Sequence, residues 1–292
     1  MTKAGFVSLI GRPNAGKSTL MNSLLGEKIA MVSQKANATR KRSNAIVMHG
    51  DTQIIFVDTP GLHEREKVLN QFMLDEAMKA MGDCDLILYL APVTDSIENY
   101  EKFLKLNNNK VKHIVLLSKI DQVSQEKLFK KIAQYNQFSD HFEALIPVAV
   151  PKKVGHKDIL DTISKLLPSS PFLYNPDDLT SELVRDIYAG FIREGIFSCV
   201  SDEVPYESDV LIDKIEENEK LDKIFATIIV EKESQKGIII GKGGDAIKRI
   251  GKYSREKIEA LSGKKAYLDL EVVVKKGWTK DKAYLEKIGY SS

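Results

Sequence analysis

Eight residues near the N-terminus have the types and spacing of a loop that holds phosphate groups. They read Gly-Arg-Pro-Asn-Ala-Gly-Lys-Ser from Gly11 to Ser18, after an apolar run and before a helical pattern. Glycines let backbone N–H groups turn toward phosphate oxygens, which the positive end of the next helix also attracts. We expect Lys17 to reach the β- and γ-phosphates and the Ser18 hydroxyl to ligate Mg²⁺. The alternative to this triphosphate site is an incidental glycine-containing turn.

Two later segments narrow the nucleotide to GTP. Asp58-Thr59-Pro60-Gly61 ends an apolar strand, where Asp58 can hold Mg²⁺ through water and the Gly61 N–H can meet the γ-phosphate. Ser118-Lys119-Ile120-Asp121 follows another strand. The Asp121 carboxylate can accept both N1–H and the exocyclic amine of guanine, an arrangement that adenine does not offer. The ordered series therefore predicts a guanine nucleotide. A kinase or ATPase with the same loop is the alternative that Asp121 disfavours.

Composition and charge place the chain among globular proteins. It has 292 residues, enough for two domains, with 43% hydrophobic and 29% charged residues. The net charge is only +2, but from Leu221 onward 16 Lys/Arg face 10 Asp/Glu. A basic final third predicts a polyanionic partner, while the near-neutral total excludes indiscriminate nucleic-acid binding.

Cysteine usage and hydropathy indicate a reducing compartment. Cys84 and Cys199 lie far apart, in no metal-ligand spacing. The longest apolar run, Leu86–Val93, is much shorter than the roughly 20 residues that span a bilayer, and the N-terminus has no signal-peptide core. We expect a soluble, cytoplasmic protein.

Alternating apolar runs and helical patterns in the first half indicate a parallel sheet covered by helices on both faces. Ser43–His49 is expected to pair antiparallel with Ile54–Val57 across the turn at Gly50-Asp51. A Pro/Ser-rich stretch then breaks the pattern, so we predict a first domain over 1–168, a linker over 169–179 and a second domain over 180–292. The expected strands are Phe6–Ile10, Ile54–Val57, Leu86–Leu90, His113–Leu117 and Ala144–Val150.

The second domain has an α+β order and a GxxG loop. A helix is expected near Thr180–Glu194, followed by two strands, a helix over Asp245–Leu261 and a strand over Ala266–Val274. A GxxG loop between helices lets phosphates approach the backbone, as in KH domains that clamp single-stranded RNA. A plain helix-capping turn is the alternative. Trp278 could stack on a base, but we expect it to pack inside the domain. The predicted RNA-binding residues are Lys236, Gly241, Lys242, Gly243, Gly244, Lys248 and Arg249.

These motifs, in this order and at this spacing, resemble the bacterial Era family of GTPases over nearly the whole chain. The resemblance implies a P-loop GTPase domain followed by a type II KH domain, with GTP hydrolysed to GDP and phosphate. Two positions depart from the family pattern: Ser118 stands where Asn is expected, and Ala149-Val150 where Ser-Ala is expected. The nucleotide contacts implied are Gly11, Asn14, Ala15, Gly16, Lys17, Ser18, Thr19, Asp58, Gly61, Ser118, Lys119, Asp121, Ala149 and Val150.

The resemblance also suggests how hydrolysis is assisted. Thr39 is the candidate to complete the Mg²⁺ shell with Ser18 and Asp58. Leu62 stands where Ras-type enzymes carry a water-orienting Gln. Asn14 is the candidate to recruit K⁺ against the phosphates, although it could merely turn the loop. The catalytic assignment is therefore Asn14, Lys17, Thr39 and Gly61.

The implied partner is the single-stranded 3′ region of small-subunit ribosomal RNA. The implied role is maturation of the small ribosomal subunit, in which bound GTP would order the Thr39 and Asp58–Leu62 regions and change RNA engagement. We expect a monomer, with peripheral association with the inner membrane as an addition. The alternative function is a membrane-associated signalling GTPase in cell-cycle control, whose basic face would meet anionic lipid.

Overall fold

The computed structural model of the chain describes residues 1–33, 39–62, 68–201 and 203–290. These residues fall into two compact units, the first built mainly from the chain up to Ser181 and the second mainly from Glu182 onward. Each unit has its own sheet and is described by itself. Within the described residues, no helix is both long and apolar enough to cross a membrane.

The first unit is built on a six-stranded sheet of order β2-β3-β1-β4-β5-β6. Only β2 and β3 run antiparallel, as predicted, and the other neighbours are parallel. The continuous apolar runs are explained by burial on both faces, since every residue of β3, β4 and β5 is buried. The strands are β1 Lys3–Ile10, β2 Ser43–His49, β3 Thr52–Asp58, β4 Leu86–Pro92, β5 His113–Ser118 and β6 Ala144–Val148.

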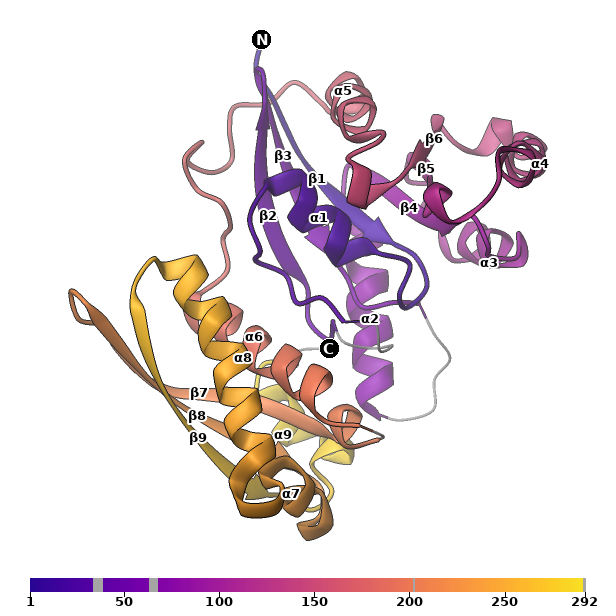
Figure 1. Ribbon diagram of the computed structural model, residues 1–292. Helices are drawn as coiled ribbons and strands as arrows, with labels where there is room; N and C mark the ends of the chain where they lie inside the picture. Colours follow the sequence, from indigo (N-terminus) through magenta and orange to yellow (C-terminus); the bar gives the residue numbers. More distant parts are fainter. Residues whose placement is uncertain (34–38, 63–67, 202, 291–292) are drawn as a thin grey trace. The chain divides into compact units, whose positions relative to one another are not determined.

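Helices flank this sheet, and the loops that bear the motifs follow the carboxyl ends of the parallel strands (Figure 1). The phosphate-binding sequence follows β1, the Asp58 segment ends β3, and the Ser118 segment ends β5. Parallel strands bring these ends to one edge of the sheet, where ligands bind in open α/β folds. The helices are α1 Lys17–Leu25, α2 Val68–Gly82, α3 Glu98–Leu106, α4 Gln125–Asn136 and α5 His156–Leu166.

The second unit pairs helices with a three-stranded sheet of order β7-β8-β9. β7 and β8 are antiparallel, whereas β8 and β9 are parallel because α7 and α8 form the crossover between them. The α+β prediction is confirmed. The elements are α6 Val184–Cys199, β7 Ser208–Glu216, β8 Leu221–Val230, α7 Glu233–Ile240, α8 Asp245–Ser262, β9 Lys265–Val274 and α9 Lys282–Lys287.

One predicted helix begins later than expected. The prediction placed its start near Thr180, but α6 begins at Val184. Thr180 instead donates its hydroxyl to the carbonyl of Asn44 at 2.5 Å, and the Asn44 amide donates to the Ser181 hydroxyl at 3.1 Å. These bonds tie the side chains of the two residues to β2, ahead of the first residue of the helix.

Trp278 packs inside the second unit, as predicted. Its side chain is fully buried, and its indole N–H donates to the carbonyl of Glu207 at 3.3 Å. A base could not stack on a ring that is covered in this way. The ring therefore contributes to stability and leaves RNA recognition to other residues.

Candidate active site and nucleic-acid interface

The phosphate-binding loop joins β1 to α1 and holds a buried lysine. Gly16 has a φ of 102°, a left-handed conformation directly before the first residue of α1. Lys17 is 6% exposed, and its ammonium group donates to the carbonyls of Gly11 and Arg12, each at 3.1 Å. Burial lowers the pKa of Lys17 to about 8. Phosphate oxygens placed beside this ammonium group would stabilise its charge, so the loop suits a polyphosphate.

Three residues predicted to hold Mg²⁺ come together at the carboxyl ends of β1 and β3. The Ser18 hydroxyl donates to Asp58 Oδ2 at 2.5 Å, and the Thr39 hydroxyl lies 3.1 Å from Ser18 Oγ and 3.4 Å from the same carboxylate oxygen. Asp58 is fully buried, and its second oxygen, Oδ1, has no hydrogen-bond partner among the residues that the structure describes. Burial raises the pKa of Asp58 to about 6.

This oxygen set fits magnesium. Mg²⁺ takes hard oxygen ligands and is usually held by one or two carboxylates together with substrate phosphates and water. A buried carboxylate with an unsatisfied oxygen, beside two hydroxyl groups, supplies such ligands. Ser18, Thr39 and Asp58 would hold the ion, which would neutralise charge on the phosphates.

The segment after Asp58 rests directly on the phosphate-binding loop. A Cβ atom at Gly61 would lie 2.5 Å from the backbone nitrogen of Pro13, so only glycine fits there. The next residue, Leu62, donates its N–H to the carbonyl of Gly11 at 3.1 Å. The Leu62 side chain packs against the apolar core that contains Tyr89. It therefore offers no polar group that could orient a water.

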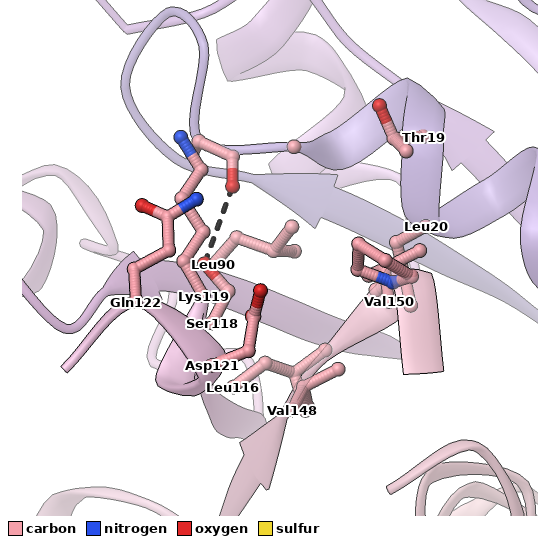
Figure 2. Close-up of a pocket in the computed structure, with 13 residues that line it drawn as sticks. Thr19, Leu20, Leu90, Leu116, Ser118, Lys119, Asp121, Gln122, Val148 and Val150 are labelled. Atoms are coloured by element: carbon pink, nitrogen blue, oxygen red, sulfur yellow. Dashed lines mark hydrogen bonds between the residues drawn. The ribbon is translucent and has the colours of Figure 1, made fainter. Parts of the chain in front are cut away.

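A cavity of about 140 Å³ lies beside the loop and has the lining expected of a purine site (Figure 2). The Asp121 carboxylate points into it, and apolar side chains form its walls. Among the predicted nucleotide residues, the lining includes Ala15, Gly16, Thr19, Ser118, Lys119, Asp121 and Val150. The walls add Leu20, Leu90, Leu116, Gln122, Val148 and Pro151, none of which a short motif marks.

Hydrogen bonds join the purine cavity to the phosphate-binding loop. Ser118 Oγ donates to the carbonyl of Ala15 at 3.2 Å, and Lys119 Nζ donates to the carbonyl of Asn14 at 2.9 Å. Lys119 takes a left-handed φ of 61° that turns its side chain back across the loop. Base and phosphate sites are thus held in one fixed relation.

The structure separates the two residues predicted to meet the guanine oxygen. Val150 lines the cavity, but Ala149 does not. The N–H of Ala149 donates to the carbonyl of Val154 at 3.3 Å, so it is committed to its own turn. Of the two residues, the position of Val150 favours it for the predicted backbone contact to the base, which stays a prediction.

An ion pair that sequence reasoning missed braces the phosphate-binding loop. The guanidinium of Arg12 forms a two-point contact with the carboxylate of Asp95, with Nη2 donating to Oδ1 at 2.6 Å. Asp95 follows β4 and also accepts a bond from Lys131 at its carbonyl, at 2.7 Å. Planar two-point contacts of this kind fix geometry as well as charge. Only the sheet order, which sets β4 beside β1, could have revealed this pair.

In the second unit the GxxG sequence forms the turn between α7 and α8. Gly241 must be glycine, because a Cβ atom there would lie 2.7 Å from the backbone nitrogen of Ala246. Lys242 and Gly243 are exposed at the tip, and nothing lies within 4 Å of the place a Gly243 Cβ would occupy. The backbone at the tip is therefore open to a close-approaching phosphate, which is what a KH clamp requires.

A basic groove of about 380 Å³ lies between α8 and β9 of the same unit. Lys248, Lys252 and Arg255 recur along one face of α8, and Tyr267, 52% exposed, stands opposite on β9. The remaining lining is Ile247, Gly251, Leu268 and Leu270. Of the predicted RNA residues only Lys248 lines the groove. Lys252, Arg255 and Tyr267 were missed, although helical spacing of the basic residues could have indicated the first two.

The other predicted RNA residues surround the clamp. Arg249 is exposed on α8 and Lys236 is half-buried on α7, and neither lines the groove. Gly244 closes the turn with a left-handed φ of 83° directly before α8. The loop and the groove together form a basic surface with an aromatic ring, the combination that single strands require.

Comparison with known families matches both halves of the chain. Residues 6–119 match the family described as 50S ribosome-binding GTPase. Residues 203–279 match the family described as KH domain. The two matches correspond to the nucleotide site and to the GxxG unit.

Whole-length relatives extend these matches. The chain is 51% identical to GTPase Era of Campylobacter lari, with 99% of each chain covered. It is 50% identical to GTPase Era of Helicobacter pylori, with 99% of this chain and 97% of the relative covered. A variant of Aquifex aeolicus Era bound to GDP and AlF4⁻ superposes with a TM-score of 0.95 at 32% identity. Era in complex with MgGDPNP and nucleotides 1506–1542 of 16S ribosomal RNA superposes with a TM-score of 0.95 at 31% identity. Both structures are covered completely, as is this chain.

Proposed function

The chain belongs to the Era family of GTPases, and we propose that its GTP cycle controls binding of the single-stranded 3′ region of small-subunit ribosomal RNA. It binds GTP and hydrolyses it to GDP and phosphate. The biological role that we assign is maturation and assembly of the small ribosomal subunit. The relative solved with nucleotides 1506–1542 of 16S ribosomal RNA supports this choice of RNA.

One observation carries the proposal: the chain that holds the guanine cavity also holds an open GxxG turn beside a basic groove. Single-stranded RNA needs close approach of its backbone, positive charge and a surface for its bases. At the turn, Gly243 permits the close approach and Lys242 supplies positive charge. Tyr267, at the groove, is the surface for a base. A GTPase that did not bind RNA would not need a glycine-rich turn held open in this way.

We assign the hydrolytic roles to residues that hold the phosphates. Lys17 and the backbone N–H groups of its loop bind and orient the phosphate oxygens, and the Gly61 N–H contacts the γ-phosphate. Ser18, Thr39 and Asp58 hold Mg²⁺, which supplies charge neutralisation. Because Leu62 packs into the core, orientation of the attacking water falls to backbone groups, and we expect slow intrinsic turnover.

We propose that Asn14 ligates K⁺ beside the phosphates and so assists hydrolysis. Asn14 has a left-handed φ of 60°, a conformation that Gly adopts without strain, so Asn14→Gly removes the amide and keeps the turn. Measured at one ionic strength, phosphate release by the unaltered protein should be faster in K⁺ than in Na⁺. The variant should lose this difference and keep its affinity for GDP. Equal rates in the two salts for the unaltered protein would exclude the cation role.

Linked affinities test the control of RNA binding. The full chain is titrated with a labelled RNA of the 3′ region of 16S ribosomal RNA, once with GDP and once with GDPNP. A coupled system should differ by roughly five- to 100-fold between the two nucleotides, and RNA should change the affinity for GDPNP by the same factor. Equal RNA affinity in the two states would refute the switch while leaving RNA binding itself established.

Location and assembly state belong to the same proposal. We infer that the protein is cytoplasmic and that it is a monomer. Sedimentation of the purified chain tests the assembly state. Peripheral association with the cytoplasmic side of the membrane is the remaining prediction. Vesicles of anionic lipid, offered in competition with the labelled RNA, distinguish it. Displacement of the RNA by vesicles would indicate that lipid and RNA share the basic surface around Lys248 and Arg255.

A further inference from the structure

Ser118 is the residue at which the purine cavity meets the phosphate-binding loop. It is the last residue of β5, it is 4% exposed, and it lines the cavity. Its hydroxyl donates to the carbonyl of Ala15 at 3.2 Å, the contact drawn as a dashed line in Figure 2. A serine hydroxyl carries one proton and two lone pairs. Because a carbonyl can only accept, the Ser118 hydroxyl uses its one proton in the hydrogen bond to Ala15. Toward a base it can therefore act only as an acceptor.

The edge of guanine presents donors and acceptors in a fixed order. The N2 amine and N1–H are donors, whereas O6 and N7 are acceptors. The Asp121 carboxylate matches the two donors, and the backbone N–H of Val150 is assigned to O6. N7 lies on the imidazole ring, which also carries the ribose and the phosphates. Ser118 is bonded to the phosphate-binding loop, so it lies on the side of that ring, and its hydroxyl has no proton left to donate to N7.

The other polar side chains that line the described cavity are placed for different contacts. Lys119 directs its ammonium group to the carbonyl of Asn14 at 2.9 Å, on the phosphate-binding loop. The Gln122 amide lies beside the Lys119 side chain, and Thr19 stands on α1 at the other end of the cavity (Figure 2). Ser118 and Lys119, the two lining side chains that are bonded to the phosphate-binding loop, therefore have their donors directed away from a bound guanine.

We propose that Ser118 makes this guanine site insensitive to position 7 of the base. The site selects guanine through N1, N2 and O6, and it accepts 7-deazaguanine nucleotides, which have a C–H group in place of N7, as well as guanine nucleotides. An Asn at this position would have two amide protons, one for the carbonyl of Ala15 and one for N7. The inference concerns the guanine site alone and does not depend on the RNA that the second unit binds.

The test compares GDP with 7-deaza-GDP on the full chain, by calorimetry or by displacement of a fluorescent GDP. We expect the dissociation constant of 7-deaza-GDP to be no more than threefold above that of GDP. Ser118→Asn should favour GDP over 7-deaza-GDP by roughly five- to tenfold, the range of one neutral hydrogen bond. Ser118→Ala removes the bond to Ala15 and should weaken both nucleotides equally, which leaves their ratio unchanged.

Each outcome decides the assignment. A preference for GDP of threefold or more in the unaltered protein would overturn it, since Gln122 or another donor would then read N7. An unchanged ratio in a folded Ser118→Asn protein would show that position 118 does not face N7 and would also overturn it. If that variant does not fold, the ratio in the unaltered protein decides alone. If the unaltered protein bound neither GDP nor 7-deaza-GDP, the guanine site itself would be contradicted. That result is distinct from a failure of the Ser118 assignment.

Discussion

Asp121→Asn should weaken GDP binding by roughly 1000-fold and create affinity for xanthine nucleotides. The carboxylate of Asp121 can accept two hydrogen bonds from guanine, whereas an amide directs one of its own N–H groups at the guanine amine. Two donors then face each other in a confined cavity, and neither is satisfied. Xanthine carries a carbonyl at that position, so the amide N–H donates to it while the amide oxygen accepts N1–H. Competition between GDP and xanthosine diphosphate (XDP) for the variant measures this change in base preference.

Two controls make the Asp121 result specific. Asp121 is exposed in the structure, so the variant should unfold at the same temperature as the unaltered protein when nucleotide is absent. ATP should displace fluorescent GDP from neither protein. Retention of GDP affinity within tenfold in the variant would show that the carboxylate does not read the base. Comparable displacement by ATP would favour a kinase or ATPase instead.

Lys242→Asp combined with Gly243→Asp should abolish RNA binding, with a loss of at least about 100-fold, while GTP turnover stays unchanged. The double change replaces a phosphate-attracting charge with two repelling ones at the tip of the clamp. The Asp at position 243 takes on the local strain of a left-handed φ of 63°, but the fold should persist, because both residues are exposed and no other described atom lies within 4 Å of a Gly243 Cβ. RNA anisotropy and phosphate release measure the two effects separately.

The chain contains a matched control for this pair. Lys276-Gly277 is the same dipeptide in the same unit, also exposed, with a left-handed φ of 76° at the glycine against 63° at Gly243. No heavy atom lies within 4 Å of a Gly277 Cβ either. Lys276→Asp with Gly277→Asp therefore makes the same change of charge and conformation away from the clamp, and it should leave RNA affinity within threefold. Equal loss from the two double variants would point to general electrostatics rather than a clamp.

The parts of the site that were predictable lie in contiguous motifs whose spacing is set by local chemistry. The loop from Gly11 to Ser18 needs its glycines and its lysine at fixed intervals, whatever the rest of the chain does. Strand runs such as Leu86–Leu90 were predicted nearly to the residue, because a strand buried on both faces is apolar throughout. The order of motifs then indicated which ends of the sheet would meet.

The parts that were missed depend on contacts between distant segments. Asp95 braces Arg12 only because β4 lies beside β1, and neither residue belongs to a motif that names the other. Tyr267 joins the basic residues of α8 only because β9 runs beneath that helix. The commitment of the Ala149 N–H to Val154 likewise follows from a turn that only coordinates reveal. Sequence patterns predict elements well and side-chain partners across elements poorly.

The central position of β1 has a consequence for how the protein matures during synthesis. β1 pairs with β3 on one side and β4 on the other, so after its synthesis it waits for partners that begin at Thr52 and Leu86. Parallel pairing between distant segments is slow to form. The phosphate-binding loop is therefore synthesised early but reaches its native conformation late, after Asp95 has been synthesised and can pair with Arg12. Cellular GTP then binds only chains whose sheet has closed, and by mass action it draws the folding equilibrium toward them.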